Sequence, residues 1–183
     1  MFKMVLASLF IVISTATSFA QDYRFYYAPV NKYWEVNGTN YPNTFPACSA
    51  KTLLDAPGSF LMFSKDLESG ELFLVIRYTR WNFKEDEEYT AKIRFYTSSG
   101  IMIDEGTANF KAFDKNGITI RHLNKSNFLD RFDTAGQMII IMPGSNNDIR
   151  LSLKGTSEAL SRMAECTKFG LGKFRSKNFE RDA

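Results

Sequence analysis

Short apolar or alternating stretches, each closed by a turn signal, follow one another along most of this chain. The clearest is Glu71–Thr79, ELFLVIRYT, which combines β-branched and aromatic residues without a helix breaker. Tyr89–Tyr96 and Ile149–Lys154 alternate apolar and polar residues, as half-buried strands do. Turn signals such as Lys115-Asn116-Gly117 separate these stretches at short intervals. The pattern predicts a chain that folds mainly as antiparallel β-structure.

One helix is expected near the C-terminus. Thr156 is a candidate cap for the stretch Thr156–Cys166, in which apolar residues recur at helical spacing. A shorter helical turn is expected over Ser126–Phe132, where Ser126 could act as the cap. The predicted fold class is therefore mainly β: an antiparallel β-sandwich or open barrel with one C-terminal helix.

The first twenty residues have the pattern of an export signal. Lys3 gives a basic start, Val5–Ile13 is almost wholly apolar, and Ser18-Phe19-Ala20 supplies the small residues that precede a cleavage point. An uncleaved membrane anchor is the alternative, but the apolar stretch is shorter than the roughly 20 residues that span a bilayer. We expect cleavage between Ala20 and Gln21. The mature protein is then periplasmic or secreted, with no further transmembrane segment.

The chain has two cysteines, Cys48 and Cys166. Export delivers them to an oxidising compartment, where paired cysteines normally form a disulfide. Two buried free thiols are the alternative. The predicted helix also places Cys166 on its apolar face, from which it could meet Cys48. Closing a loop of more than 100 residues contributes roughly 4–5 kcal/mol in the chain-entropy model.

The predicted domain organisation has three parts: the signal peptide at 1–20, a single β-rich domain at 21–167, and a basic, phenylalanine-containing flexible tail at 168–183. Phenylalanines recur every five residues in this tail, which matches neither the helix nor the strand period. Cations beside aromatic rings suit a partner surface, whereas a frayed terminus with incidental charge is the alternative. The candidate partner-binding residues of the tail are Lys168, Phe169, Lys173, Phe174, Arg175, Lys177 and Phe179.

Aromatic residues also crowd the start of the predicted domain. Tyr26, Tyr33 and Trp34 are candidates for an aromatic platform that binds a glycan or a peptide. The alternative is that these rings pack across strands as part of the core.

Catalytic chemistry has little support in the sequence. The single histidine, His122, ends a predicted strand, and no G-x-S-x-G or phosphate-binding glycine motif is present. One histidine and two cysteines are too few for a zinc site. The acidic run Glu85–Glu88 is interpreted as a solvated loop rather than a cation site, and Asp104 with Glu105 as a weak candidate for glycosidase-type carboxylates. We expect no catalytic residues, no metal and no cofactor.

Two segments resemble a known family. The first combines Tyr33-Trp34-Glu35-Val36 with Ala47-Cys48-Ser49-Ala50, and the second is Ile149–Cys166, IRLSLKGTSEALSRMAEC. Both are similar to the invasion-associated locus B family and to related small periplasmic proteins of α-proteobacteria. The resemblance covers the two ends of the domain and not its middle. It implies a bacterial periplasmic or secreted β-rich protein without known catalysis.

These observations favour an exported, non-enzymatic protein that binds an envelope protein partner or assembly. Nucleic acid is not an expected partner for an exported chain. Three alternatives stay open: a glycan or small-ligand binding domain, a hydrolase that uses carboxylates, and an enzyme inhibitor acting through the loop Asn37–Pro46.

Overall fold

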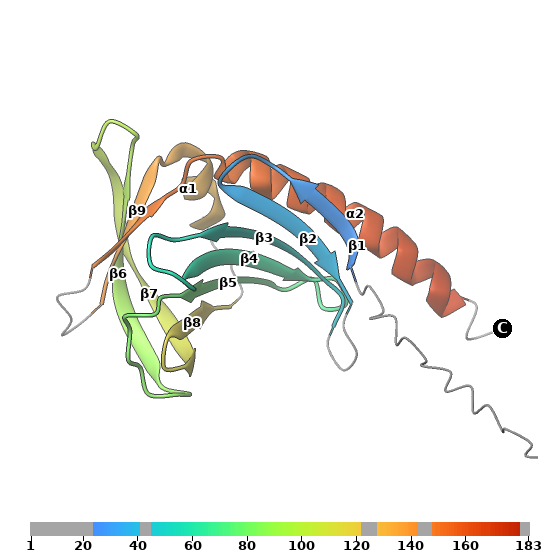
Figure 1. Cartoon of the computed structure of the whole chain (residues 1–183), viewed down its shortest axis with the longest axis horizontal. Coiled ribbons are helices and arrows are strands. Elements are labelled where there is room, and N and C mark those ends of the chain that lie inside the picture. The colour runs from blue at the N-terminus through green and yellow to red at the C-terminus, as the bar shows by residue number, and fades with distance from the viewer. Residues whose placement is uncertain (1–23, 41–44, 122–127, 143–147, 180–183) are drawn as a thin grey trace, which may run out of the picture.

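The computed structural model describes residues 24–40, 45–121, 128–142 and 148–179. The predicted signal peptide with its cleavage point, His122 and Ser126 lie outside the described residues. The elements follow one another along the chain as shown in Figure 1: β1 (Arg24–Pro29), β2 (Trp34–Thr39), β3 (Ala47–Leu53), β4 (Phe60–Asp66), β5 (Leu72–Arg77), β6 (Glu88–Tyr96), β7 (Met102–Asp114), β8 (Gly117–Ile120), α1 (Phe128–Thr134), β9 (Gln137–Ile141), β10 (Ile149–Ser152) and α2 (Thr156–Phe179).

The ten strands form one antiparallel sheet in the order β1-β2-β3-β4-β5-β8-β7-β6-β9-β10. The sheet does not close into a barrel, so β1 and β10 are its two edges. The predicted class, mainly antiparallel β with a C-terminal helix, is confirmed. Of the two architectures expected, the open one describes this sheet better than a sandwich of two sheets.

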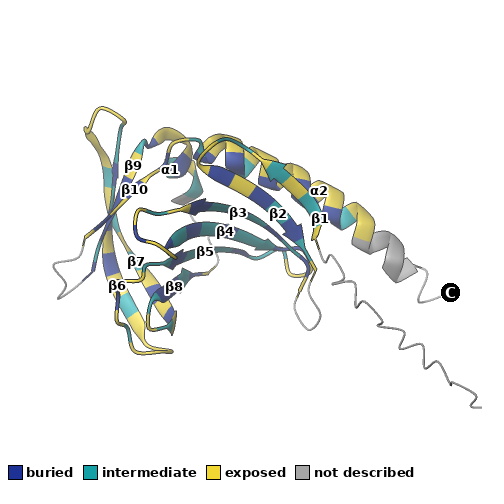
Figure 2. Ribbon diagram, in the orientation of Figure 1, coloured by how far each residue is buried: buried dark blue, intermediate teal, exposed yellow. Residues whose placement is uncertain are grey.

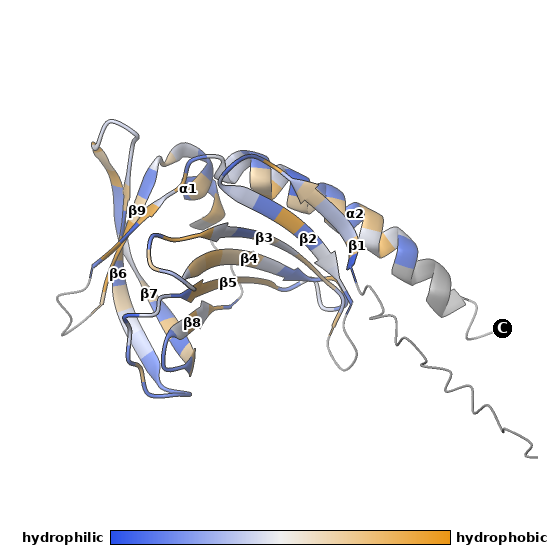
Figure 3. Cartoon of the chain, viewed as in Figure 1, coloured by the Kyte–Doolittle hydropathy of each residue, from blue (hydrophilic) through white to orange (hydrophobic). Residues whose placement is uncertain are grey.

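Alternation along the strands gives the sheet one buried face, which we call the inner face. A single row across it joins Val36, Ala50, Phe63, Leu74 and Ile120, which lie beside one another on successive strands. All five side chains are buried. Along the same strands, buried residues alternate mostly with residues of intermediate exposure in Figure 2, and Figure 3 shows the matching change in hydropathy. Because strand side chains alternate between faces, this pattern collects the apolar residues into one core.

The helix α1 fills the inner face where the sheet bends. Strands β6, β7 and β9 run across the direction of β2–β5 (Figure 1). Phe132 of α1 makes edge-on contacts with Phe63 of β4, at 4.9 Å between ring centroids, and with Phe95 of β6, at 5.4 Å. Its side chain is 1% exposed. One aromatic ring therefore joins the two parts of the sheet.

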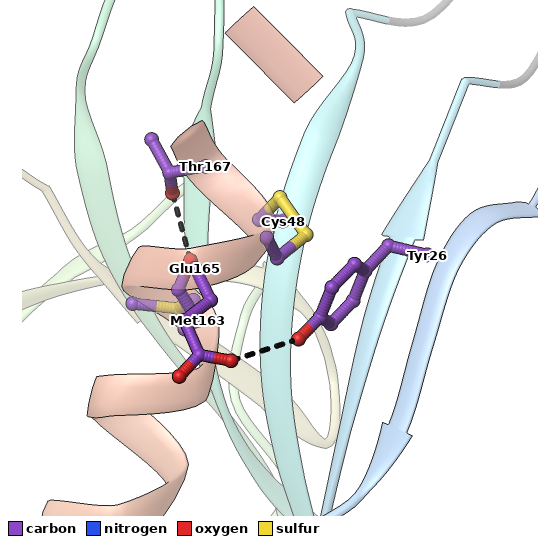
Figure 4. Close-up of a disulfide and its surroundings, with 6 residues drawn as sticks. Tyr26, Cys48, Met163, Glu165 and Thr167 are labelled. Atoms are coloured by element: carbon purple, nitrogen blue, oxygen red, sulfur yellow. Dashed lines mark hydrogen bonds between the residues drawn. A yellow bond between two sulfur atoms is a disulfide. The ribbon is translucent and has the colours of Figure 1, made fainter. Parts of the chain in front are cut away.

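A disulfide holds α2 to the sheet. Cys48 of β3 and Cys166 of α2 are bonded, and their Cα atoms are 6.0 Å apart (Figure 4). Both cysteines are fully buried. Beside them the hydroxyl of Tyr26 donates to a carboxylate oxygen of Glu165 at 3.4 Å. The predicted disulfide is confirmed, and it fixes the middle of α2 against β3.

The predicted end of the helix at Cys166 is wrong, because α2 continues to Phe179 through residues that the sequence assigned to the tail. Gly170 is buried, and a Cβ atom there would lie 2.5 Å from the side chain of Leu67. The ring of Phe169 stacks on Phe25 of β1, with 6.5 Å between centroids. The side of α2 that packs on the sheet thus continues beyond Cys166 with small residues such as Gly170. It does not follow the five-residue spacing of the phenylalanines.

Candidate functional site

The two edges of the sheet differ in how well they could pair with another strand. β1 contains Pro29, and its register with β2 shifts between Arg24 and Tyr26. Proline and bulges are common devices that discourage pairing at an edge. The edge strand β10 has neither feature, and its register with β9 is regular from Ile149 to Ser152. β10 is therefore the edge whose backbone is suited to pairing.

Hydrogen bonding near β10 shows which of its backbone groups are turned outward. The amide of Leu153 donates to the carbonyl of Gly136 at 2.9 Å, so Leu153 faces β9. Backbone direction alternates in an antiparallel strand, so Ile149 and Leu151 also face β9, whereas Arg150 and Ser152 face the other way. Within the described residues β10 pairs with β9 alone. The N–H and C=O groups of Arg150 and Ser152 therefore point away from the sheet.

A groove lies beside this edge, with a cavity volume of about 560 Å³. The wall opposite β10 is formed by residues at or next to the ends of β2, β3 and β5, on the other side of the gap in the open sheet. We call it the seam groove, because it lies where the sheet fails to close. Its lining residues are Tyr33, Thr52, Leu53, Leu54, Asp55, Tyr78, Gln137, Asp148, Ile149, Arg150, Leu151, Ser152 and Lys154.

The seam groove has an apolar floor and a charged rim. Thr52, Ile149 and Leu151 are buried, and Leu54 and Tyr78 pack against the core. Four lining residues of the rim are charged and exposed: two acids, Asp55 and Asp148, and two bases, Arg150 and Lys154. A ligand in this groove would meet apolar side chains on one side and both signs of charge on the other.

One end of the seam groove is fixed to β2. The indole Nε1 of Trp34 donates to the carbonyl of Lys154 at 3.0 Å. The side-chain oxygen of Asn31 accepts from the amides of Tyr33 and Trp34, at 2.8 and 3.1 Å. The bond from Trp34 holds the segment after β10 against the start of β2. The bonds to Asn31 shape the turn that leads into β2.

Tyr33 lies at this end close to two cations. Its ring centroid lies 5.0 Å from Nζ of Lys32 and 5.5 Å from Nζ of Lys154. The pKa of Tyr33 is lowered, chiefly by a hydrogen bond that the Lys32 ammonium donates and further by the charge of Lys154. The Tyr33 side chain is 38% exposed. This end of the groove therefore combines an aromatic face with positive charge and suits an anionic group.

The three residues predicted to form an aromatic platform do not share a surface. Trp34 is 2% exposed and stacks on Phe63 in the core, with 6.1 Å between ring centroids. Tyr26 is half-buried and turned toward Glu165 of α2. Tyr33 alone of the three is exposed. Tyr33 lies in the bend before β2, whereas Trp34 is the first residue of β2 and turns into the core, which the crowding of aromatics in the sequence does not reveal.

A second, shallower hollow of about 250 Å³ adjoins the seam groove and shares two of its lining residues, Tyr33 and Leu53. Tyr27 also lines this hollow. Tyr27 is 51% exposed and Leu53 is 75% exposed. We call these three residues the outer shelf. They supply the exposed aromatic surface that the predicted platform does not.

The predicted tail residues lie along the last part of α2. Lys168 is exposed, Phe169 is 54% exposed, and Nζ of Lys173 lies 5.9 Å from the ring centroid of Phe25. The side chains of Phe174, Arg175, Lys177 and Phe179 lie outside the described residues. This end of α2 projects beyond β1, on the side of the molecule away from β9 (Figure 1). The structure does not bring the tail residues to the seam groove.

The carboxylates considered for chemistry are held in surface ion pairs. Asp104 pairs with Arg131 at 2.5 Å, and Glu105 pairs with Arg94 at 2.5 Å. The hydrogen bond from Arg94 lowers the pKa of Glu105. Asp86 of the acidic run pairs with Lys111 at 2.8 Å. None of these contacts arranges a carboxyl as a general acid.

Two further features are absent from the described part of the chain. No group of three or more His, Cys, Asp or Glu side chains there is arranged to hold a metal ion. Nor does that part contain a helix long and apolar enough to cross a bilayer.

No family model, curated protein or solved structure matches the chain.

Sequence reasoning missed the seam groove. The alternation in Ile149–Lys154 indicates a half-buried strand, and that prediction is confirmed. Its position at an edge depends on strand order, which is a property of the whole sheet. A local signal did exist: this strand lacks proline, glycine and a bulge, whereas the aromatic stretch at the other edge contains Pro29.

Proposed function

We propose that this protein is an exported, non-enzymatic binding protein that captures an extended segment of another envelope protein by strand addition to β10. The observation that carries the proposal is the regular, outward-facing edge of β10 beside a groove of about 560 Å³. An added strand would complete hydrogen bonds that the sheet leaves open at this edge.

The backbone of β10 offers hydrogen-bonding groups to an added strand. Arg150 and Ser152 each present one N–H and one C=O group, so an added strand could form about four hydrogen bonds with them. Main-chain bonds of this kind give affinity, while the pockets that receive alternate side chains give specificity. The apolar floor and charged rim provide such contacts on either side of an added strand.

Three features support an envelope location. The disulfide is the kind of bond that persists in oxidising compartments. The first twenty residues have the pattern of a cleaved export signal, with the cut between Ala20 and Gln21. The resemblance to the invasion-associated locus B family points to the periplasm or to secretion. The tail residues of α2 then provide a separate basic surface for a second contact with the assembly.

Glycan binding on the outer shelf is a second candidate function. The observation that favours it is the exposure of Tyr27 and Tyr33 beside the 250 Å³ hollow, because sugar rings stack on exposed aromatic faces. Replacement of Tyr27 by Ala distinguishes the two candidates. Loss of envelope-glycan binding in this variant, with protein capture retained, would support the second candidate.

The proposed function is tested by site-specific photo-crosslinking in cells that export the protein. A photoreactive phenylalanine replaces Leu53, which is 75% exposed at the groove wall. A matched probe replaces Ile101, which is 67% exposed in the β6–β7 turn. We expect an adduct with one protein at Leu53, about tenfold weaker when Ser152→Pro removes an outward N–H group, and retained in Ser152→Ala.

The control variants decide the interpretation. Ser152→Ala removes the hydroxyl and keeps the backbone N–H, so it separates side-chain from main-chain effects. An adduct at Leu53 that Ser152→Pro leaves at full strength contradicts strand addition. An adduct at Ile101 alone places the partner on a different surface.

A further inference from the structure

We infer that the captured segment runs antiparallel to β10 and carries a defined charge order: an acidic residue at its N-terminal end, alternate apolar residues, and a basic residue at its C-terminal end. This inference rests on the proposed function and names the chemistry of the partner at the same groove. It follows from three independent properties of the site: strand direction, the position of charges along the rim, and the division into floor and rim.

The direction follows from the sheet. Each of the strand pairs in the described sheet is antiparallel, including β9 with β10. Antiparallel pairs have straighter hydrogen bonds and are slightly more stable per residue than parallel pairs. An antiparallel segment begins beside Lys154 and ends beside Asp148.

The charges stand at opposite ends of the groove. Lys154 lies at one end with Tyr33, and Nζ of Lys32 lies 5.0 Å from the centroid of the same ring. The nearby carboxylate of Glu158 accepts a hydrogen bond from Asn31 at 3.4 Å. Asp148 lies at the other end, immediately before β10, whereas Lys154 lies in the turn that follows β10. The rim therefore presents positive charge where the segment begins and negative charge where it ends.

The floor sets the residues between these ends. Residues directly opposite one another in an antiparallel pair share a face of the sheet. Segment residues opposite Ile149 and Leu151 would therefore turn toward the floor formed with Leu54 and Tyr78, which suits apolar side chains. Those opposite Arg150 and Ser152 turn toward solvent and suit polar side chains. The resulting pattern is acidic, apolar, polar, apolar, polar, apolar, basic.

Two blocked peptides of identical composition test the inference on the intact protein. The first is Asp-Val-Thr-Val-Thr-Val-Lys, and the second is the same sequence reversed, so that only the order of the terminal charges differs. Titration up to about 2 mM is followed by the amide NMR shifts of Arg150 and Ser152, since strand addition of this length is expected to be weak. We expect the first peptide to bind about fivefold more tightly than the second.

A double charge exchange provides the matched control. In the variant Asp148→Lys with Lys154→Asp, the preference should reverse by a similar factor, while the sum of the charges on the rim is unchanged. Equal binding of both peptides, with shifts at Arg150 and Ser152, overturns the charge order and leaves strand capture standing. Preference for the reversed peptide by the unmodified protein also overturns the inference. Binding of neither peptide overturns both the inference and the proposed function.

Discussion

The two ends of the sheet are built differently. At the β1 end, α2 lies against β1, β2 and β3, the Cys48–Cys166 disulfide links α2 to β3, and the edge strand carries Pro29 and a bulge. At the β10 end, the edge strand is regular and a groove lies beside it. One end is covalently fixed and protected from pairing, whereas the other is open to it. The difference indicates which end is available for binding.

The contrast also shows how such a protein can keep an open edge and still be stable. Exposed edges invite aggregation, and natural sheets usually protect them. Here β10 is short and carries exposed Arg150, and its end is held by the bond from Trp34 to Lys154. The stability comes from the rest of the molecule, through the disulfide and the Phe132 contacts.

The largest effect is expected from Phe132→Ala, which removes the ring that joins the two parts of the sheet. Replacing a buried phenylalanine by alanine lowers the unfolding free energy by about 3–5 kcal/mol, because the lost transfer free energy and the cost of the cavity add. Chemical denaturation measures the loss, and Asp133→Ala in the same helix, where the side chain is exposed, is the control. A loss below about 1 kcal/mol would show that the two parts do not depend on α1.

Removal of the disulfide tests the fixed end. The bond closes a separation of 118 residues, so Cys48→Ala with Cys166→Ala is expected to lower the unfolding free energy by about 3–5 kcal/mol. The amide spectrum of β10 should be unchanged under native conditions, because the disulfide lies at the other end of the sheet. Changes confined to β10 would contradict the separation of the two ends.

Proline substitution distinguishes the two sides of β10. Leu151→Pro removes an N–H that faces β9, so it should cost about 3 kcal/mol or more. Ser152→Pro removes an N–H that faces outward, so it should cost about 1 kcal/mol or less. Thermal unfolding of both variants measures the difference. Equal losses would mean that the outward groups of β10 already have partners in the folded protein.

Two glycines of α2 test whether its last part is packed on the β1 end. A Cβ at Gly170 would lie 2.5 Å from Leu67 and 3.1 Å from Phe25, whereas a Cβ at Gly172 meets open space. Gly172→Ala should stabilise by up to about 1 kcal/mol through helix propensity. Gly170→Ala should destabilise by about 1–2 kcal/mol through overpacking. Equal stabilisation by both would show that this part of α2 does not contact the sheet.

A smaller effect is expected at the centre of the sheet. Partial burial acts to raise the pKa of Asp114, but bonds from the Asn116 and Gly117 amides and from Arg77 lower it overall. A lowered folded pKa means that the carboxylate stabilises the protein above its unfolded pKa of about 3.9, and that this contribution is lost as the pH falls.

Asp114→Asn should therefore cost under about 1 kcal/mol at pH 7, since the pair is partly exposed, and the cost should shrink below pH 4. Denaturation of both proteins at several pH values measures the difference in unfolding free energy. Strands β1 and β10 at the two edges should be unaffected. A cost that grows as the pH falls would contradict the assigned direction of the pKa shift.

Much of the fold could be predicted because alternation is a local signal. The patterns in Tyr89–Tyr96 and Ile149–Lys154 predicted strands in the right places, and the two cysteines, together with the predicted export signal, led to the prediction of the disulfide. The end of α2 could not be predicted in the same way. Glycines at 170 and 172 resemble helix breakers, and the reason that Gly170 belongs in the helix is the position of Leu67, a tertiary fact.

The candidate site was predictable only in part. Tyr33 was a candidate for the aromatic platform, and it lines the seam groove. Trp34, its neighbour, has a structural role in the core, because β2 begins at Trp34 and its side chain is buried. The rest of the groove is assembled from the ends of strands far apart in the sequence. Its residues, such as Tyr78 and Ser152, have no shared local signal.

Hydrogen exchange at the amides of β10 tests the central claim most directly. In the free protein, Ile149, Leu151 and Leu153 should be protected by their bonds to β9, whereas Arg150 and Ser152 should exchange rapidly. Addition of the Asp-Val-Thr-Val-Thr-Val-Lys peptide should slow exchange at Arg150 and Ser152 and leave the other three unchanged. Two results would contradict an edge that is open for strand capture. One is protection of the Arg150 and Ser152 amides equal to that of Leu151 in the free protein. The other is exchange at Arg150 and Ser152 that saturating peptide does not slow.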